Sequence, residues 1–490
     1  MLRVAVIGAG SAGLAAAQQL RAVAGAHAVQ VVVYETRDRV GGLWQYTPEP
    51  GPCSIHVPTS PEPGDAGYAT WDAWPDDLCP SAMYEDLRTN IPSTLMAFRD
   101  HPFPPTTAMF PVRAEVLSYL ESFARHYDLL SCIRFQTRVV RASKYDGAWQ
   151  VTSRSTVAPQ AERTDTYDCL IAAQGRCSAP YIPPIPGLAH FRGRQLHSAW
   201  YRYPDALHTR RVLIVGNNSS GADIARELCG GSVRTWPHQA DWHPSSVTVF
   251  QSYHNVAEPP PMDYDPRDPA SPAWCRRIHV VSSIERIDDS GAILLRDGQR
   301  LEGIDLIVWA TGFLYQLPFF DPTEAPFAEA PLLHRDAHTR TAPTARAASV
   351  LHHLDDWMLL YKADPTLCFL GLPNRIVPFP FTQLQARAVA HIWLGLMPPL
   401  PRVHAMRPVD DPQRWKPWPA SRAEEAEALP GPDVHGHFTL GAEAEHAYTD
   451  ALLALLPVSA RNDKVWTPYS AARRALRKAG KQHRRDQLGY

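Results

Sequence analysis

The sequence lacks long apolar runs, a strong excess of charge of either sign and closely spaced cysteine pairs. No apolar stretch reaches the length of about 18 residues that a membrane-spanning helix needs, so we expect no transmembrane segment. The formal net charge of −2 gives no reason to expect nucleic acid as a partner. The eight cysteines are scattered and form no CxxC pair, which is typical of reduced thiols in a cytoplasmic protein.

Signature motifs of several enzyme classes are also missing. The sequence has no HExxH motif of a zinc peptidase and no GxSxG motif of a hydrolase, and we expect no metal site. The first expected strand begins almost at Met1, which leaves no room for a cleaved targeting peptide. The C-terminus from Arg473 to Arg485 is basic and rich in alanine, and such a helix can lie on an anionic surface. A solvated helix or a frayed tail is the more common role.

What the chain does contain is an ordinary globular composition with much proline. Apolar residues make up 45% and charged residues 20% of the 490 positions, so the chain can bury a sizeable core. This length suits two or three domains of about 150 residues or more. The 47 prolines predict many rigid, irregular connections.

A glycine-rich turn near the N-terminus carries the clearest signal. Gly8 to Gly13 has the sequence GAGSAG and lies between an expected strand, Leu2 to Ile7, and an expected helix, Leu14 to Val23. Such glycines allow a tight turn in which the helix N-terminus faces the phosphates of a dinucleotide. Glu35 ends the next β-branched run, where a carboxylate binds ribose hydroxyls. We therefore expect cofactor contacts from Gly8, Gly10, Ser11, Ala12, Gly13 and Glu35.

A second pair of glycines follows Glu35 closely. The sequence Gly41-Gly42-Leu43-Trp44 would by itself be an ordinary turn with a core tryptophan. Its short distance from Glu35 instead favours a backbone that approaches a ligand. We expect cofactor contacts from Gly42, Leu43 and Trp44.

A similar strand, turn and helix recur in the middle of the chain. The turn Gly216 to Gly221 follows the strand Arg211 to Val215, and Asn218 replaces the middle glycine because Asn tolerates left-handed backbone. The run Val233 to Trp236 is the expected second strand; it carries Arg234 and ends in no acid, which favours NADPH over NADH. A plain surface role for Arg234 is an equal alternative. The expected contacts are Gly216, Ser219, Ser220, Gly221, Asp223 and Arg234.

Two dinucleotide-binding turns in one chain are most simply explained by a flavin together with a nicotinamide. A late apolar strand, Leu306 to Ala310, runs into Thr311 and Gly312, where backbone can again pass close to a cofactor. The expected fold class is α/β, with two dinucleotide-binding, Rossmann-like domains. The expected NADP-binding domain, residues 204–304, is inserted into a discontinuous FAD-binding domain of residues 1–203 and 305–490.

With these motifs in place, the sequence resembles the flavin-containing monooxygenase family of class B flavoprotein monooxygenases. The segment Phe191 to Tyr201 matches the family fingerprint FxGxxxHxxx(Y/F), and related Baeyer–Villiger enzymes carry Trp at the position of Tyr201. The segment Tyr84 to Phe103 resembles the family segment centred on Thr89 and Asn90. The resemblance implies further contacts to FAD or NADP from Thr89, Asn90, the stretch Thr137 to Val139, Gln383 and Gln385 to Arg387.

The resemblance implies an enzyme that uses FAD, NADPH and O2. NADPH would reduce FAD, O2 would form a C4a-hydroperoxyflavin, and the soft nitrogen or sulfur atom of an amine or sulfide would take the distal oxygen. Asn90 is the expected catalytic residue, and His197 is expected to be structural. The stretches Gln45 to Met83 and Asp321 to Val350 match no family pattern, so the substrate stays open, as does homodimer formation.

Three other functions share part of this pattern. A Baeyer–Villiger or N-hydroxylating monooxygenase shares the same flavin chemistry and stays open. A catalytically degenerate flavoprotein that acts as a redox-dependent binding module is an alternative of another class, against which the intact motifs argue. A disulfide reductase is disfavoured because Cys53 has no near cysteine partner.

Overall fold

The chain folds into two compact units, each built from several stretches of sequence. The computed structural model describes residues 1–25, 28–56, 67–70, 80–158, 161–231, 244–260, 264–333, 347–348, 351–402, 438–461 and 464–488. Unit 1 comprises Met1–Gln45, Ile91–Arg176 and Tyr315–Lys478, and unit 2 comprises Tyr46–Asn90, Cys177–Leu314 and Ala479–Tyr490. These units are defined by packing, so the assignment of FAD to residues 1–203 with 305–490 and of NADP to 204–304 stays a proposal.

A five-stranded parallel sheet forms the centre of unit 1, with the strand order β21-β9-β1-β2-β5. Parallel strands covered on both faces are made of continuous apolar runs, and all four residues of β9 are buried. The strands are β1 (Leu2–Ile7), β2 (Val29–Tyr34), β5 (Ile133–Arg134), β9 (Cys169–Ala172) and β21 (Leu367–Phe369).

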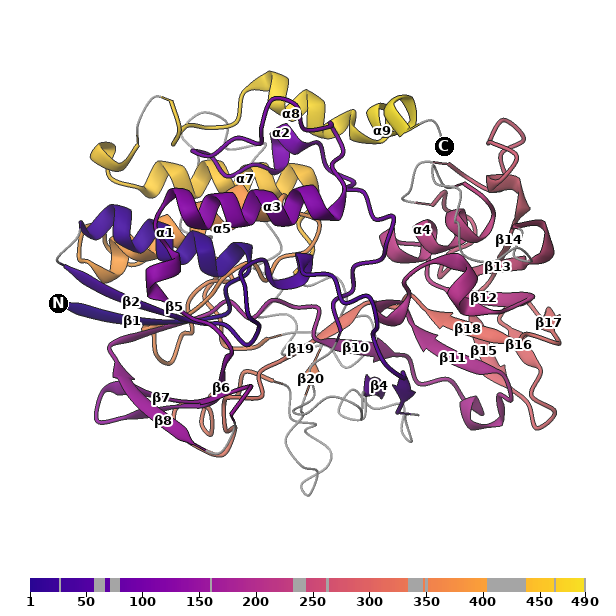
Figure 1. Ribbon diagram of the computed structural model, residues 1–490, viewed down its shortest axis with the longest axis horizontal. Helices are drawn as coiled ribbons and strands as arrows, with labels where there is room; N and C mark the ends of the chain where they lie inside the picture. Colours follow the sequence, from indigo (N-terminus) through magenta and orange to yellow (C-terminus); the bar gives the residue numbers. More distant parts are fainter. Residues whose placement is uncertain are drawn as a thin grey trace. The chain divides into compact units, whose positions relative to one another are not determined.

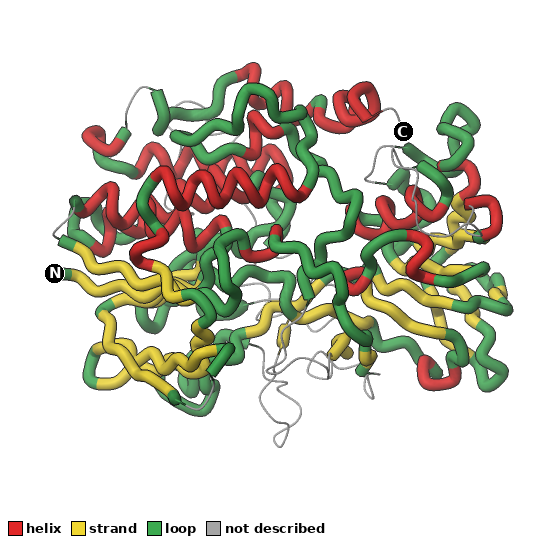
Figure 2. Tube along the Cα trace, viewed as in Figure 1, coloured by secondary structure: helices red, strands yellow, loops and turns green. Residues whose placement is uncertain are grey.

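Helices cover one face of this sheet, and a small antiparallel sheet lies on the other (Figure 2). The alanine-rich sequence of α1 favours a helix and lets α5 approach it closely. The helices are α1 (Ser11–Ala24), α2 (Ser93–Met96), α3 (Arg113–His126), α5 (Pro378–Trp393), α7 (Gly441–Leu455) and α8 (Ala471–Lys478). The antiparallel sheet is β6 (Thr137–Tyr145), β7 (Ala148–Ser155) and β8 (Glu162–Tyr167).

Unit 2 repeats this design around a second parallel sheet, with the order β11-β18-β12-β13-β14 and α4 packed beside it (Figure 1). In each unit the central strand, β1 or β12, is followed directly by a glycine-rich turn and a helix. The strands are β11 (Arg194–His197), β12 (Arg211–Val215), β13 (Thr248–Ser252), β14 (Ile278–Val281) and β18 (Leu306–Trp309). The helices are α4 (Ser219–Leu228) and α9 (Gly480–Leu488).

Short antiparallel strands complete the fold. One three-stranded sheet is β15 (Ile284–Ile287), β16 (Ile293–Leu295) and β17 (Arg300–Leu301). Further antiparallel pairs join β3 (Ser54–Ile55), β4 (Gly67–Thr70), β10 (Ala179–Ile182), β19 (Phe313–Gln316) and β20 (Ala347–Ala348).

Two sequence-based expectations need correction. The second strand of the unit 2 sheet is β13, which pairs along β12 from Arg211 opposite Thr248 to Val215 opposite Ser252. The run Val233 to Trp236, expected in that role, lies outside the described residues. The C-terminal segment forms two helices that bury almost none of their residues, as the solvated-helix alternative predicted, but it is not a frayed tail, because Arg473 of α8 donates to the Thr94 carbonyl at 2.8 Å and Arg484 of α9 is buried. Composition alone cannot show which arginines find buried partners.

No helix among the described residues is both long enough and apolar enough to cross a membrane.

Candidate dinucleotide sites

The first glycines of the two turns have the same backbone geometry. Gly8 has a φ of +102° and Gly216 a φ of +112°, a region that side chains other than glycine rarely adopt. A Cβ on Gly8 would lie 2.7 Å from the Ala173 carbonyl oxygen, and one on Gly216 would lie 2.5 Å from that of Ala310. The close passage of a neighbouring strand therefore requires glycine at both places.

The last glycines of the turns are required for a second reason. A Cβ on Gly13 would overlap the Gly8 carbonyl oxygen, and a Cβ on Gly221 would overlap that of Gly216. Each turn thus closes by packing the first helical turn directly on the end of the strand. Helix α1 and helix α4 therefore begin at the carboxyl end of their sheets, where α/β folds bind ligands.

The middle position of each turn has no such requirement. Gly10 has φ −75° and ψ −173°, and Asn218 has φ −77° and ψ −172°, which is extended backbone open to any residue. The expectation that Asn218 is accepted for its left-handed tolerance is therefore wrong. A Cβ on Gly10 would meet only the Gly42 Cα, at 3.6 Å. The fold therefore does not require glycine at this position, and glycine leaves the backbone open to the close approach of a ligand.

Both helix N-termini are open to an anion. Neither the cap of α1, Gly10, nor the cap of α4, Asn218, makes a side-chain capping hydrogen bond, and neither first turn contains an acidic residue. The backbone N–H groups of a first helical turn have no partner within the helix and favour negative charge. Both turns therefore fit the pyrophosphate of a dinucleotide.

Glu35 lies directly beside the first turn. Its Oε2 accepts the Ala9 N–H at 2.8 Å and its Oε1 accepts the Arg37 N–H at 2.9 Å. Burial raises the pKa of this carboxyl, and hydrogen bonds from the Arg37 and Ala9 backbone oppose the rise. The Thr137 N–H donates to the Glu35 backbone carbonyl at 2.8 Å, so β6, which also contains Val139, begins beside Glu35.

The turn at residues 41–44 packs against the same site. The Gly41 N–H donates to the Ala9 carbonyl at 3.0 Å, and a Cβ on Gly42 would lie 2.9 Å from the Gly10 Cα. The Arg37 guanidinium donates to the Gly42 carbonyl at 2.6 Å. Leu43 and Trp44 follow in the 3-10 helix Gly42–Trp44. The structure thus brings these expected contacts together around the N-terminus of α1.

In unit 2 the equivalent of Glu35 is Tyr253. Tyr34 pairs with Ile7 at the end of β2, and Ser252 pairs with Val215 at the end of β13, so the next residue occupies the same place in each unit. The Gly8 N–H donates to the Tyr34 carbonyl at 2.8 Å, and the Gly216 N–H donates to the Ser252 carbonyl at 3.1 Å. Among the described residues, a tyrosine therefore stands in unit 2 where unit 1 has the Glu35 carboxylate.

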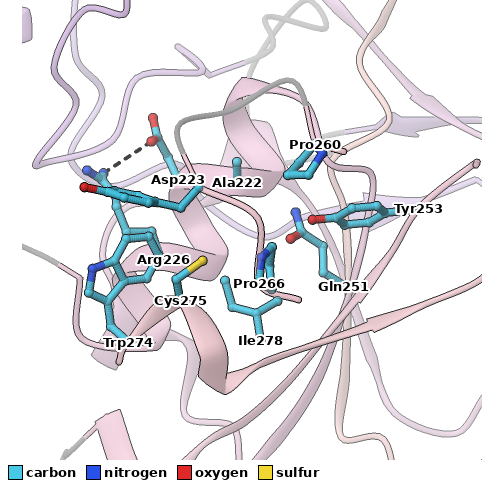
Figure 3. Close-up of a pocket in the computed structure, with 11 residues that line it drawn as sticks. Ala222, Asp223, Arg226, Gln251, Tyr253, Pro260, Pro266, Trp274, Cys275 and Ile278 are labelled. Carbon is cyan, nitrogen blue, oxygen red and sulfur yellow. Dashed lines mark ion pairs between the residues drawn. The ribbon is translucent and has the colours of Figure 1, made fainter. Parts of the chain in front are cut away.

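A pocket of unit 2 lies between α4, the end of β13 and the segment that leads to β14 (Figure 3). Its lining includes three aromatic side chains, from Tyr253, Tyr264 and Trp274. Gln251 also lines the pocket and donates from Nε2 to the Gly216 carbonyl at 3.1 Å. The pocket thus adjoins the second glycine-rich turn.

Asn90 lies at the N-terminus of α4. Its exposed amide donates from Nδ2 to Ser219 Oγ at 3.2 Å, while the preceding Thr89 is buried. Both groups belong to unit 2. The expected catalytic asparagine and the second turn are therefore in direct contact, although more than a hundred residues separate them in the sequence.

Comparison with known proteins gives the family. Residues 76–235 match the family model "Flavin-binding monooxygenase-like", and residues 6–62 match "NAD(P)-binding Rossmann-like domain". The flavin-containing monooxygenase FMO GS-OX5 of Arabidopsis thaliana is 31% identical, over 79% of this chain and 73% of its own. The chain belongs to the flavin-containing monooxygenases.

Solved structures share the fold over most of the chain. An S-allyl-L-cysteine S-oxygenase from Allium sativum superposes with a TM-score of 0.70 at 24% identity, covering 99% of this chain and 93% of its own. A flavin-containing monooxygenase from Stenotrophomonas maltophilia has a TM-score of 0.56 at 21% identity, covering 81% and 99%. The expected fold class and the expected family are confirmed. Family membership also supports FAD and NADPH as cofactors.

Three expected contacts of this monooxygenase are used differently or not described. Arg234 lies outside the described residues. Asp223 is buried, and both its oxygens have protein partners: Oδ1 lies 3.3 Å from Arg226 Nη2, and the Tyr84 hydroxyl donates to Oδ2. Gln383 is fully buried, and its Oε1 accepts the Arg99 N–H at 2.8 Å. Asp223 also lines the pocket of unit 2. The expected cofactor contacts of Asp223 and Gln383 stay predictions.

The late strand end and His197 form a structural cluster in unit 2. His197 Nδ1 accepts the Ala199 N–H at 3.2 Å, so its Nε2 carries the proton that is donated to the Gly312 carbonyl at 3.0 Å. Burial lowers the pKa of this histidine to about 3, which keeps it neutral. The neighbouring Thr311 hydroxyl donates to the Tyr181 carbonyl. His197 therefore positions the backbone around Thr311 and Gly312.

Sequence reasoning missed several residues of these sites. Arg37 joins Glu35 to Gly42, and its signal was its place within the short Glu35–Gly42 interval. Gly371, with a φ of +72°, follows β21 and lies beside Ala12 of α1. A glycine directly after a buried strand was its signal.

Replacing Gly10 and Gly13 separately should distinguish cofactor binding from folding. Gly13→Ala forces a methyl group into the Gly8 carbonyl and should destabilise the flavin-free protein by about 3 kcal/mol or more. Gly10→Ala should leave that stability near wild type but weaken FAD binding at least about tenfold, because the methyl occupies the space of the pyrophosphate. Thermal unfolding and FAD titration measure the two effects. The assignment of Gly10 to FAD binding would be contradicted if both variants lost the same stability in the flavin-free protein. Normal FAD binding by Gly10→Ala would contradict it as well.

Glu227 of α4 should make the stability of the protein depend on pH. It is fully buried, it accepts the Tyr201 hydroxyl at 2.5 Å, and burial raises its pKa to about 8. Because this value exceeds the usual one of about 4.3, the stabilising contribution is complete at acid pH and is lost as the pH rises toward 8. Glu227→Gln should therefore gain at least about 1 kcal/mol over wild type between pH 5 and pH 8. Urea unfolding at several pH values measures the free energy of unfolding, and Glu285→Gln, at an exposed glutamate, is the control. The prediction would be refuted if the free energies of Glu227→Gln and wild type changed with pH in parallel.

Proposed function

We propose that this flavin-containing monooxygenase uses NADPH and O2 to oxygenate a soft nitrogen or sulfur atom of a small molecule. The observation that carries the proposal is that each unit has a helix N-terminus open to an anion. Asn90 lies at the one in unit 2. When bound, the flavin supplies the redox chemistry, so few protein acids or bases are needed. The protein binds, orients and shields the reactants.

Unit 1 suits the flavin nucleotide and unit 2 suits the nicotinamide nucleotide. In unit 1 the Glu35 carboxylate stands where ribose hydroxyls are bound, and Gly10 and Gly42 leave backbone exposed to the pyrophosphate. In unit 2 Tyr253 stands in place of that carboxylate, which removes a charge that would repel a 2′-phosphate. This supports NADPH over NADH, and we place its adenine half in the aromatic pocket beside Tyr253.

Asn90 is the residue we place in the chemistry. Its amide can donate two hydrogen bonds and accept two, and the bond to Ser219 fixes its orientation at the start of α4. From there it can hydrogen-bond the bound nicotinamide nucleotide and the reacting oxygen without changing its charge. A neutral amide suits this role because it can hydrogen-bond the reacting oxygen without transferring a proton to it.

Oxygen transfer can be tested directly with labelled oxygen. Under 18O2, one 18O atom should enter the product for each NADPH consumed, as a sulfoxide from thioanisole or an N-oxide from N,N-dimethylaniline. The thioether is tried first, because a solved structure of the same fold is named an S-oxygenase. NADPH consumption that yields only hydrogen peroxide would refute the proposal. Conversion of cyclohexanone to its lactone with no heteroatom product would favour the Baeyer–Villiger alternative instead.

Asn90→Ala should separate oxygen transfer from cofactor binding. We expect oxygenated product to fall roughly a hundredfold, the loss typical of one positioned hydrogen-bond donor. FAD content should stay at the wild-type level, because the turn that we assign to FAD lies in unit 1. Asn255→Ala, at another exposed asparagine of unit 2, is the matched control. Unchanged product formation by Asn90→Ala would remove Asn90 from the mechanism.

A further inference from the structure

The C-terminal helix α9 buries an arginine inside unit 2. Arg484 is 3% exposed, and its Nη2 lies 3.2 Å from Asp223 Oδ1. The neighbouring Arg485 instead lies over the Tyr264 ring, with its guanidinium carbon 4.9 Å from the centroid. Burying a guanidinium costs free energy unless it is paired, and Asp223 is the carboxylate that pairs with Arg484.

Asp223 connects Arg484 to the segment that carries Asn90. Burial opposes ionisation of Asp223, but Arg226 and Arg484 outweigh it and hold its pKa below the usual range. The charged carboxylate then accepts the Tyr84 hydroxyl on Oδ2, while both arginines face Oδ1. Arg484 therefore helps to keep the acceptor of Tyr84 in its charged form.

The segment from Tyr84 to Asn90 is held at both ends along α4. Its start is fixed by the Tyr84 hydroxyl on Asp223 and by the Tyr84 ring, whose centroid lies 5.7 Å from that of Tyr201. Its end is fixed by the Asn90 amide on Ser219. Ser219 and Asp223 are four positions apart, which places them on one face of the helix.

We propose that Arg484 is a positioning residue, which acts through Asp223 and Tyr84 to hold the segment Tyr84–Asn90 along α4 and thereby places the Asn90 amide at Ser219. The C-terminal helix is then a working part of the second dinucleotide site. The consequence for oxygen transfer rests on the proposed function of Asn90, whereas the positioning itself can be measured without any turnover.

Amide hydrogen exchange tests the positioning. In Arg484→Met, amides of the Tyr84–Asn90 segment should exchange about tenfold faster, within the range expected for coupled neighbours. Arg484→Lys should restore slow exchange in part, and Arg485→Met should match wild type. Unchanged exchange in Arg484→Met, an equal increase in Arg485→Met, or an increase that extends equally to β1 in unit 1 would each overturn the proposal.

A double-mutant cycle tests the route through Asn90. The readout is oxygenated product per NADPH consumed, which a loss of folded enzyme does not change. In the wild-type background, Arg484→Met should lower this ratio. In the Asn90→Ala background, adding Arg484→Met should leave the ratio unchanged. Additive losses would overturn the route. If wild-type enzyme makes no oxygenated product, the proposed function fails, while the exchange result still decides the positioning.

Discussion

The close crossing of backbone at the two glycine-rich turns is the constraint on which the structure depends. At each turn the strand end, the first helical turn and a neighbouring strand pass within a distance that leaves no room for a Cβ. This packing fixes the direction of α1 and α4 relative to their sheets. Their N-termini consequently stand at the carboxyl ends of the strands, which is what makes them anion sites.

In the function that we propose, the two units use this constraint for different ligands. Around the first turn, Glu35 and Gly42 surround the helix N-terminus with a carboxylate and bare backbone, as a flavin nucleotide requires. Around the second, Asn218 stands where the first has Gly10, and Tyr253 stands where the first has the Glu35 carboxylate. One fold thus supports two nucleotide sites of different specificity through a few substitutions at equivalent places.

Helix α4 also carries three buried ionisable side chains. Asp223, Arg226 and Glu227 are all buried, and their partners include Tyr84, Tyr201 and Arg484 from three other parts of unit 2. A network of this kind stabilises little by itself, because desolvation offsets the attraction between the charges. Its value is that it specifies one arrangement of the surrounding segments.

The sequence by itself determined the local features of the fold, namely the turns and the strands and helices beside them. The glycine spacings, the acid after β2 and the apolar runs of the strands are dictated by backbone sterics, so they predicted both βαβ units and the parallel sheets. Helix α5 begins at Pro378, because proline suits a first helical turn. What only the tertiary structure decided are the partners: β13 beside β12, Tyr84 and Arg484 on Asp223, and the Arg99 N–H on Gln383. Strand pairing and charge pairing join residues far apart in the chain, and no local pattern records them.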